Sequence, residues 1–359
     1  MITLDTCFVS DLEGNIIWYY SAGAGTTAAG PCKLLPNGNL ATLVVNATTG
    51  SSAIQEIDLA GNIIRQLTNS ALNQQLAEQG YSISIANFHH DVLPLPNGHW
   101  IVLTNANVPY TDLPGYPGTT KVLGDIVIDL DPNWKPVWVW SSFDHLDVNR
   151  HVLGLPDWTH SNALVYTPND GNLLLSMRNQ SWILKLDYEN GAGSGNVLWR
   201  LGNQGDFALS GGDPREWFYA QHFPSPVSIS GSRITLAIFD DGDNRDLDEI
   251  GDMCGTPGNE PCYSRATIFK LDESTKIASL DWQFLPGLYT FWGGSINQLA
   301  NGNVEFDMSE PFPQDPVSSL VTEVTQTDDP KVVWQMTIRG GNAYRAYRVP
   351  SLYPGVAWQ

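Results

Sequence analysis

Three histidines occupy the same position in three similar stretches of this sequence. They are His90 in "NFHHDVLPLPNGHWIVLTNAN" (87–107), His160 in "DWTHSNALVYTPNDGNLLLSMRN" (157–179) and His222 in "WFYAQHFPSPVSISGSRITLAIFDDG" (217–242). Each stands just ahead of a strand-like run that a small turn closes, although the chain has only seven histidines. Imidazole changes its protonation near neutral pH and can serve as nucleophile, general acid or general base. The repetition therefore predicts that the three side chains act together.

Three imidazoles could bind a catalytic zinc ion, or they could share nucleophilic and acid–base work. Arg178, at the end of the second strand of the His160 stretch, helps to choose between these uses. A guanidinium is unfavourable beside a metal cation, whereas its planar fork pairs with two oxygens of a sulfate or phosphate. We therefore expect a cluster that acts on an anionic ester and holds no metal. In the alternative, which stays open, each histidine only forms hydrogen bonds with the polar groups of a buried turn.

A repeat of paired strands must position these residues. Five strand–turn–strand stretches contain an Asn-Gly, Asp-Gly or Ser-Gly turn, at 34–45, 94–105, 167–178, 228–239 and 298–309. Each is followed by a second pair that alternates apolar residues, at 53–67, 125–140, 182–201, 266–284 and 321–336. Four strands per unit, repeated along the chain, are typical of β-propeller blades.

The repeat predicts an all-β fold: a six-bladed β-propeller with long inter-blade loops, forming one domain over residues 1–359. Residues 8–20 match the outer half of a unit, and residues 342–353 are expected to supply the missing inner strand and close the sixth blade. Two separate sandwich domains are the alternative. Helices look scarce, and residues 69–80 have helical composition with an Asn or Ser cap. In a propeller the first strand of each blade lines the channel, so His90, His160, His222 and Arg178 should meet there.

The order of the motifs resembles that of the bacterial and fungal arylsulfotransferases. The resemblance lies in "HHD" (89–91), "DWTHSNALVY" (157–166), "LLLSMRN" (173–179), "YAQH" (219–222) and "FDDG" (239–242), and it continues through "ILKLD…VLWRLGNQGDF" (183–207). It implies transfer of a sulfuryl group from a phenol ester to another phenol through a covalent sulfohistidine. His222 matches the nucleophile of the family, and His90, His160 and Arg178 match its transition-state residues. Between the paired histidines, we prefer His90 over His89 because His90 adjoins Asp91.

The resemblance also sets expectations for ligands and partners. Small aryl sulfates and phenols are the expected substrates. Near the motif histidines in the sequence, the expected substrate-binding residues are Phe88, His89, Trp158, Asn162, Trp217 and Tyr219. The aromatic members, with Phe218, could sandwich a phenyl ring or could simply pack loops. No nucleotide donor is expected, since no Gly-rich phosphate motif occurs. The family's long bacterial members carry an N-terminal β-sandwich that aids dimerisation, whereas this chain starts in a blade, so a monomer and a homodimer both stay open.

A different hydrolase or lyase on the same scaffold, or a non-catalytic anion-binding propeller, remains an alternative, because fold alone does not fix function. The net charge of −20 argues against nucleic acid as a partner and requires a local cationic cluster for any anionic substrate. No apolar run is long enough to span a membrane.

Four cysteines suggest an oxidising compartment, and hence a secreted or periplasmic mature protein. We expect Cys254 to pair with Cys262 across "GTPGNEP", and Cys7 to pair with Cys32. Four buried free thiols are the alternative. No cofactor is expected. The acidic stretch 239–249 could bind Ca²⁺ but lacks the full spacing of a calcium loop, which favours a solvated turn.

Overall fold

The computed structural model describes residues 6–23, 25–46, 48–247 and 252–353. These form two compact units. Unit 1 comprises the described parts of Met1–Asn149, Leu155–Thr159 and Tyr347–Gln359, and unit 2 comprises those of Arg150–Gly154 and His160–Ala346. The single domain expected over 1–359 stays a prediction.

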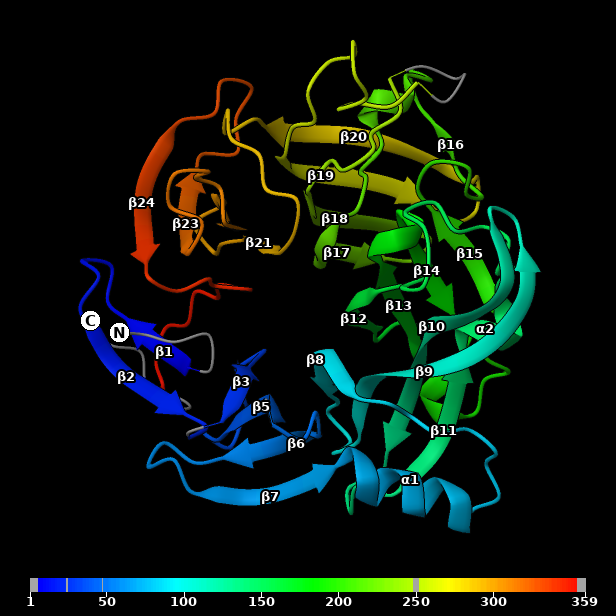
Figure 1. The fold of residues 1–359 in the computed structure, drawn as a ribbon. Coiled ribbons are helices and arrows are strands. Elements are labelled where there is room, and N and C mark those ends of the chain that lie inside the picture. Colours follow the sequence, from blue (N-terminus) through cyan, green and yellow to red (C-terminus); the bar gives the residue numbers. More distant parts are fainter. Residues whose placement is uncertain (1–5, 24, 47, 248–251, 354–359) are drawn as a thin grey trace. The chain divides into compact units, whose positions relative to one another are not determined.

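Unit 1 contains eleven strands and two helices among its described residues. In chain order these are β1 (Thr6–Ser10), β2 (Ile16–Ser21), β3 (Thr26–Ala29), β4 (Lys33–Leu34), β5 (Leu40–Asn46), β6 (Ser52–Ile57), β7 (Ile63–Thr68), α1 (Asn69–Glu78), β8 (Phe88–Pro94), β9 (Trp100–Leu113), β10 (Tyr116–Leu130), β11 (Pro136–Ser141) and α2 (Ser142–His145) (Figure 1).

Unit 2 contains the remaining strands and three short 3₁₀ helices, at Arg178–Gln180, Glu189–Gly191 and Pro214–Glu216. Its strands are β12 (Ser161–Thr167), β13 (Asn172–Met177), β14 (Trp182–Leu186), β15 (Val197–Leu201), β16 (Ala208–Leu209), β17 (His222–Ser230), β18 (Arg233–Asp240), β19 (Arg265–Asp272), β20 (Ile277–Phe284), β21 (Gly294–Gln298), β22 (Val304–Ser309), β23 (Ser318–Val324) and β24 (Val332–Arg339).

The strands form propeller-type blades. The sheets run β3-β5-β6-β7 with β4 added, β8 to β11, β12 to β15, β17 to β20 with β16 added, and β21 to β24. Neighbouring strands in these sheets are antiparallel except β16, which pairs with β20 in parallel. The middle strands are buried, as in β13 and β22, whereas the outermost strand β24 alternates between exposed and half-buried residues. The all-β class and the blade repeat are confirmed.

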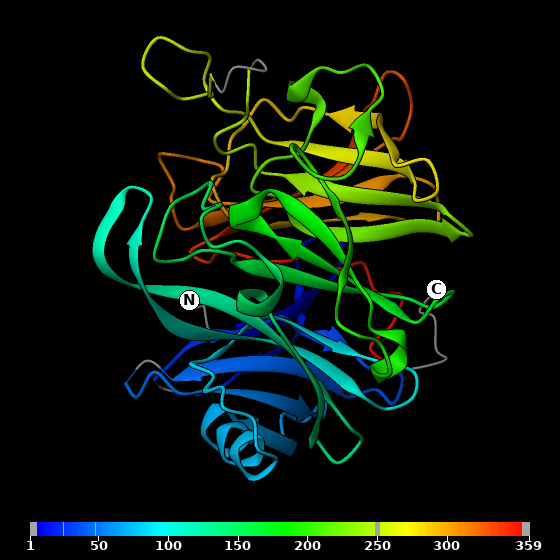
Figure 2. The same ribbon diagram turned by 90° about the vertical axis from the view of Figure 1, so that its right-hand side faces the viewer.

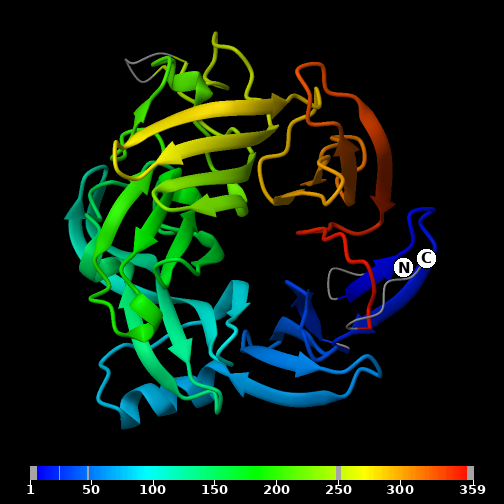
Figure 3. The ribbon, with the colours of Figure 1, turned by 180° about the vertical axis from the view of Figure 1, so that it is seen from behind.

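The predicted sixth blade is wrong: within the described ranges, five sheets have four or five strands. The N-terminal half-unit forms only the two-stranded sheet of β1 and β2, paired antiparallel. Residues 342–353 form no strand and therefore add none to it. Figure 3 shows the chain after β24 as a red trace without an arrow. The segment "AYRAYRV" (343–349) forms no strand, and its backbone at Ala343 and Ala346 hydrogen-bonds to side chains of β21, β22 and β23.

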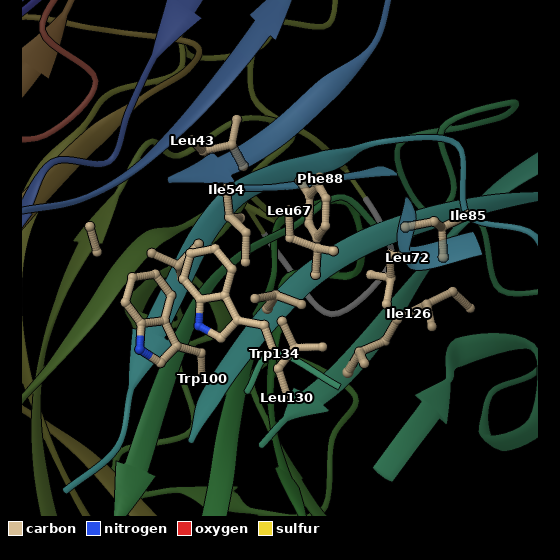
Figure 4. Close-up of a cluster of buried hydrophobic side chains, with 14 of the residues drawn as sticks. Leu43, Ile54, Leu67, Leu72, Ile85, Phe88, Trp100, Ile126, Leu130 and Trp134 are labelled. Atoms are coloured by element: carbon tan, nitrogen blue, oxygen red, sulfur yellow. The ribbon is translucent and has the colours of Figure 1, made fainter. Parts of the chain in front are cut away.

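The core of unit 1 is an apolar cluster between two of its sheets and α1. Leu43 and Ile54 contribute from β5 and β6, and Trp100 packs against Trp134 with ring centroids 4.8 Å apart (Figure 4). The predicted helix at 69–80 is confirmed as α1, although its N-cap is Thr68. The hairpin of β9 and β10 extends past its shorter neighbours in the sheet (Figure 2). No helix among the described residues is long and apolar enough to cross a membrane.

Candidate active site

The three repeated histidines take equivalent places in their sheets. His222 is the first residue of β17, His160 directly precedes β12, and His90 is the third residue of β8. Each of these strands is the edge strand with which its blade begins. In unit 2, β12 contacts β17, and β17 contacts β21, so the edge strands of neighbouring blades lie beside one another. The repeat therefore brings His160 and His222 to one region of unit 2.

The backbone at all three histidines is irregular in the same way. The ladder register shifts between Phe88 and Val92, just after His160 in β12, and just after His222. His90 and His160 have left-handed backbone conformations, with φ of 55° and 50°, and Phe223 beside His222 has φ of 45°. A left-handed non-glycine residue costs about 1–3 kcal/mol and is retained where the surrounding structure demands it, often at functional sites. Such bulges re-aim side chains.

His222 forms a buried pair with Asp241. The imidazole Nδ1 hydrogen-bonds to the Asp241 carboxylate, and the side chains are 2% and 0% exposed. Burial lowers the pKa of His222 well below its usual range, and the positive charges of Arg178, His160 and Arg345 lower it further. Burial raises the pKa of Asp241, with Arg178 acting against this shift. The His222 ring is therefore held neutral, with Nδ1 directed at a carboxylate.

The segment before His222 is fixed by hydrogen bonds to both sides. The Gln221 side chain is fully buried and donates to the Ser176 hydroxyl at 3.0 Å and to the Trp182 carbonyl at 2.9 Å. The Ala220 amide donates to the Ser181 hydroxyl at 3.0 Å. These bonds tie the "YAQH" motif to the neighbouring blade, so that His222 has little freedom to move.

A glycine turn after β18 presents two carboxylates. Gly242 has φ of 84°, and a Cβ there would collide with the Tyr263 carbonyl and lie 2.7 Å from Arg245 Nη2. Only glycine fits this turn, which directs Asp241 to His222 and Asp243 to Arg178. Burial raises the pKa of Asp243 to about 6, with Arg178 acting in the opposite direction.

Arg178 lies in the 3₁₀ turn after β13 and is largely buried. Its Nη2 donates to Asp243 and to the Phe291 carbonyl, both at 2.6 Å, and its Nη1 donates to Asn179 at 2.9 Å. Its backbone amide donates to the His160 carbonyl at 3.2 Å. Its buried Nε has no hydrogen-bond partner among the described residues. Arg178 and His160 are thus held together through the backbone, and both raise the positive potential at His222.

Asn162 is fully buried, and its side-chain nitrogen donates to the Gln221 carbonyl at 2.7 Å. It links β12 to the segment before β17. Its predicted contact with substrate stays a prediction.

The paired histidines of unit 1 form a separate chain of contacts. His89 Nδ1 lies 2.7 Å from His90 Nδ1, and His89 Nε2 lies 3.2 Å from the Asp125 carboxylate. Asp91 instead forms an ion pair of 2.6 Å with Lys33. The reason given for preferring His90, its neighbour Asp91, therefore does not hold, because Asp91 is engaged by Lys33. His89 connects Asp125 to His90.

The aromatic residues predicted to bind substrate are buried in the core. Phe88 belongs to the cluster of Figure 4, and Trp158 packs against Phe143. Trp217 stacks on Phe269 with centroids 6.0 Å apart, and Phe218 and Tyr219 belong to the same cluster. Core packing accounts for these five side chains, and their contact with an aryl ring stays a prediction.

Exposed aromatic side chains occur instead on the loop between β20 and β21. Tyr289 is 38% exposed and donates a hydrogen bond to Asp243 at 2.6 Å. Phe291 is 55% exposed, and its carbonyl accepts from Arg178. The Ser264 hydroxyl lies within hydrogen-bonding distance of the backbone of Thr290 and of the Asp241 carbonyl, which fixes the loop beside the carboxylates. The loop thus contacts Arg178 through the Phe291 carbonyl and contacts its partner Asp243 through the Tyr289 hydroxyl.

Both predicted disulfides are present, Cys254–Cys262 and Cys7–Cys32. They are compatible with an oxidising compartment. In the acidic stretch 239–249, Asp240 pairs with the buried Arg245 and Arg265, and residues 248 and 249 lie outside the described residues. Within the described ranges, no group of three or more His, Cys, Asp or Glu residues could hold a metal ion. The expectation of a solvated turn, with Ca²⁺ binding as the alternative, stays a prediction.

Several residues around His222 were not predicted from the sequence. Asp241 follows β18 much as Arg178 follows β13, so the repeat that placed Arg178 also contained the signal for Asp241. Asp243 and Tyr289 carried no such signal, since both lie in irregular loops. Arg345 was assigned to a strand that does not form.

Comparison with known proteins gives a family for this chain. The sequence model described as Arylsulfotransferase (ASST) matches residues 2–348. No curated protein matches significantly. Similar solved structures include Saccharomyces cerevisiae Sqt1, with 10% identity and a TM-score of 0.40 over 91% of this chain and 77% of that one. Another is an exo-β-1,3-galactanase from Clostridium thermocellum, with 10% identity and a TM-score of 0.39 over 94% and 67%. The family match includes His90, His160, Arg178, His222 and Asp241.

Proposed function

Since the chain belongs to the arylsulfotransferase (ASST) family, we propose that it moves a sulfuryl group from a phenolic sulfate ester to a phenol by a ping-pong reaction through a sulfohistidine at His222. Family membership supports arylsulfotransferase activity in general. The observation that carries the finer proposal is the buried His222–Asp241 pair beside Arg178.

The pair prepares a nucleophile. When Asp241 is ionised, its carboxylate accepts a hydrogen bond from the Nδ1–H group of His222, which leaves the ring lone pair on Nε2. A carboxylate thus selects the tautomer, as in hydrolase triads. Burial and the nearby cations keep the ring from taking a second proton. A proton added to the pair at low pH would remove the lone pair or reverse the tautomer, so acid should suppress the reaction.

In the first half-reaction, His222 Nε2 attacks the sulfur, an N–S bond forms, and the S–O bond to the aryl group breaks. Arg178 stabilises the negative charge on the sulfuryl oxygens. His160, whose charge acts on His222, is the candidate in unit 2 to protonate the departing phenolate. The resemblance gives His90 a role in the same step, and that role remains a prediction.

In the second half-reaction, His160, which gave up its proton in the first, acts as the base. The acceptor phenol loses its proton to His160 and attacks the sulfur. The N–S bond breaks, and the electron pair returns to His222 Nε2. The net change is the exchange of one aryl oxygen for another, so neither an oxidant nor a nucleotide donor such as PAPS is required. A phenol is a poor leaving group unless its oxygen is protonated, because its pKa is about 10 by analogy with tyrosine.

We place the aryl ring of the donor against Tyr289 and Phe291. Both residues are exposed, and they contact Arg178 through a backbone carbonyl and its partner Asp243 through a hydroxyl, whereas the predicted aromatic residues are buried in the core. Offset or edge-to-face contact with such rings contributes about 0.5–1.5 kcal/mol beyond burial of area. We also propose a secreted or periplasmic location, which the two disulfides support.

The test is incubation with 4-nitrophenyl sulfate, with and without added phenol. The proposal expects 4-nitrophenol release that depends on phenol, together with phenyl sulfate as product and a sulfuryl group mapped to His222. Release at the same rate without phenol, and no phenyl sulfate, would identify a hydrolase. Binding of the ester without turnover would identify an anion-binding protein.

A further inference from the structure

Residues 342–346, which we call the C-terminal strap, follow β24 and lie against the first strands of their own sheet. The sequence predicts a strand here, but the strap has none, and Figure 3 shows it as part of the red trace. It belongs to unit 2 together with His222.

Buried side chains of β21, β22 and β23 hold both ends of the strap. Their hydrogen bonds to its backbone measure between 2.6 and 3.2 Å. The partners are Ser309 and Ser319 at Ala343, and Ser295 and Asp307 at Ala346. The backbone between these anchors has a defined path, and it carries Tyr344 and Arg345.

The two side chains reach the surroundings of the nucleophile. The Tyr344 ring lies edge-to-face with the His222 ring, with centroids 5.8 Å apart and planes at 84°. The Arg345 guanidinium lies 4.5 Å from the centroid of Phe223, the residue after His222, and donates to the Asn162 carbonyl. Its positive charge contributes to the lowered pKa of His222.

Arg345 therefore adds a second guanidinium near His222. Arg178 is shared with Asp243 and a backbone carbonyl, which leaves it only part of its capacity for a ligand. A sulfuryl group has three oxygens that gain negative charge as it transfers, and a chain of net charge −20 needs local cations to bind it.

We propose that Arg345 binds the transferring sulfuryl group together with Arg178, and that Tyr344 positions the plane of the His222 ring. This inference deepens the proposed function and rests on it. Arg345 is thereby a catalytic residue, and Tyr344 is a positioning residue that acts through His222.

The first experiment measures the rate at which 4-nitrophenyl sulfate labels His222 without acceptor, as a function of pH. Arg345→Gln should slow labelling by roughly 10²–10³, as loss of one stabilising donor does. Arg345→Lys should retain more activity because it keeps the charge and loses only the fork. Since a nearby positive charge lowers the pKa of His222, its removal should move the acid limb of the profile to higher pH.

The control is Arg339→Gln, which also removes one positive charge from unit 2. Arg339 is exposed on β24 and pairs with Asp315, so its loss should change neither the rate nor the profile. Wild-type rate and an unshifted profile in Arg345→Gln would overturn the inference. If Arg345→Gln fails to fold, the labelling rate of Arg345→Lys is used instead. A rate equal to that of the wild type would contradict a role for the planar guanidinium of Arg345.

A second experiment separates this inference from the proposed function. The affinity of 4-nitrophenyl sulfate is measured by calorimetry in His222→Ala, with and without Arg345→Gln. Loss of tenfold or more in affinity supports Arg345 as a ligand, whether or not the wild type forms a sulfohistidine. Equal affinities overturn it. Absence of labelling in the wild type would reject only the proposed function.

Discussion

The two units each contain a histidine in contact with a carboxylate, and the surroundings of the two pairs differ. In unit 2 the His222–Asp241 pair is 2% and 0% exposed and is surrounded by cations. In unit 1 the His89–Asp125 pair is 12% and 3% exposed, and its next neighbour is a second imidazole, that of His90. The surroundings in unit 2 keep the His222 ring neutral. The contacts in unit 1 can set the tautomer of the His90 ring.

The difference follows from hydrogen-bonding capacity. The 3.2 Å contact between His89 Nε2 and Asp125 lacks hydrogen-bond geometry, so Asp125 acts on His89 through its charge. If that charge keeps a proton on His89 Nε2, then His89 Nδ1 is an acceptor, and His90 Nδ1 must donate to it. The lone pair of His90 then lies on Nε2, which suits a general base. In unit 2, the carboxylate acts directly on the proposed nucleophile. We therefore expect His222 and Asp241 to control the covalent step, whereas the role predicted for His90 is proton transfer.

The largest expected effect is that of His222→Ala, which should abolish both turnover and the covalent intermediate. The measurement is peptide mapping after incubation with an aryl sulfate and no acceptor. His90→Ala should slow turnover and still permit slow labelling of His222. As a control, His99→Asn removes a histidine that pairs with Asp129 at 2.9 Å outside both clusters, and it should label normally. A sulfuryl group found on His90 would reverse the roles proposed for His222 and His90.

Asp241→Asn should have the next largest effect. An amide in place of the carboxylate leaves the geometry but favours the wrong tautomer of His222, so labelling should slow by roughly 10²–10⁴. The rate is measured by stopped-flow release of 4-nitrophenol. The matched control is Asp129→Asn, which makes the same change at the His99 pair. A labelling rate within twofold of wild type would show that Asp241 has no part in activating His222.

Asp125→Asn should have a smaller effect, because it acts through His89 on His90. We expect turnover with phenol to fall by about tenfold to a hundredfold. This loss is part of the roughly 10²–10⁴-fold rate enhancement that a general acid or base provides. Labelling by 4-nitrophenyl sulfate, whose leaving group needs less protonation, should change little. These two rates are compared in one preparation. An equal loss in both would mean that Asp125 supports the fold rather than proton transfer.

The smallest effect concerns Asp243 and pH. Burial holds the pKa of this carboxyl at about 6, so it becomes negatively charged beside Arg178 as the pH rises through that value. The charge repels an anionic donor, and KM for the donor should increase by about fivefold, as expected for about 1 kcal/mol. Asp243→Asn should remove this rise. If KM of the variant still increases across the same range, another group causes the dependence.

Part of the fold and part of the site followed from sequence alone. The turn signals and the alternation of apolar residues identified the blades, because both are local properties of the chain. Equivalent positions in the repeat identified His222, His160 and Arg178, and the structure brings these three together in unit 2. The spacing of the cysteines identified both disulfides.

Other features depended on contacts between distant residues. Asp241 was visible as part of an acidic run, yet its pairing with His222 depends on the turn at Gly242. "AYRAYRV" was expected to supply the missing inner strand of a sixth blade, but serines of β21, β22 and β23 hydrogen-bond to its backbone instead. The aromatic residues predicted to bind substrate lie near the histidine motifs in the sequence, but they are buried and belong to the core. Sequence thus determined which residue types recur at each blade, since that pattern is local. Only the tertiary structure decided that Asp241 pairs with His222 and that Arg345 reaches the neighbourhood of His222, because these contacts join different segments of the folded chain.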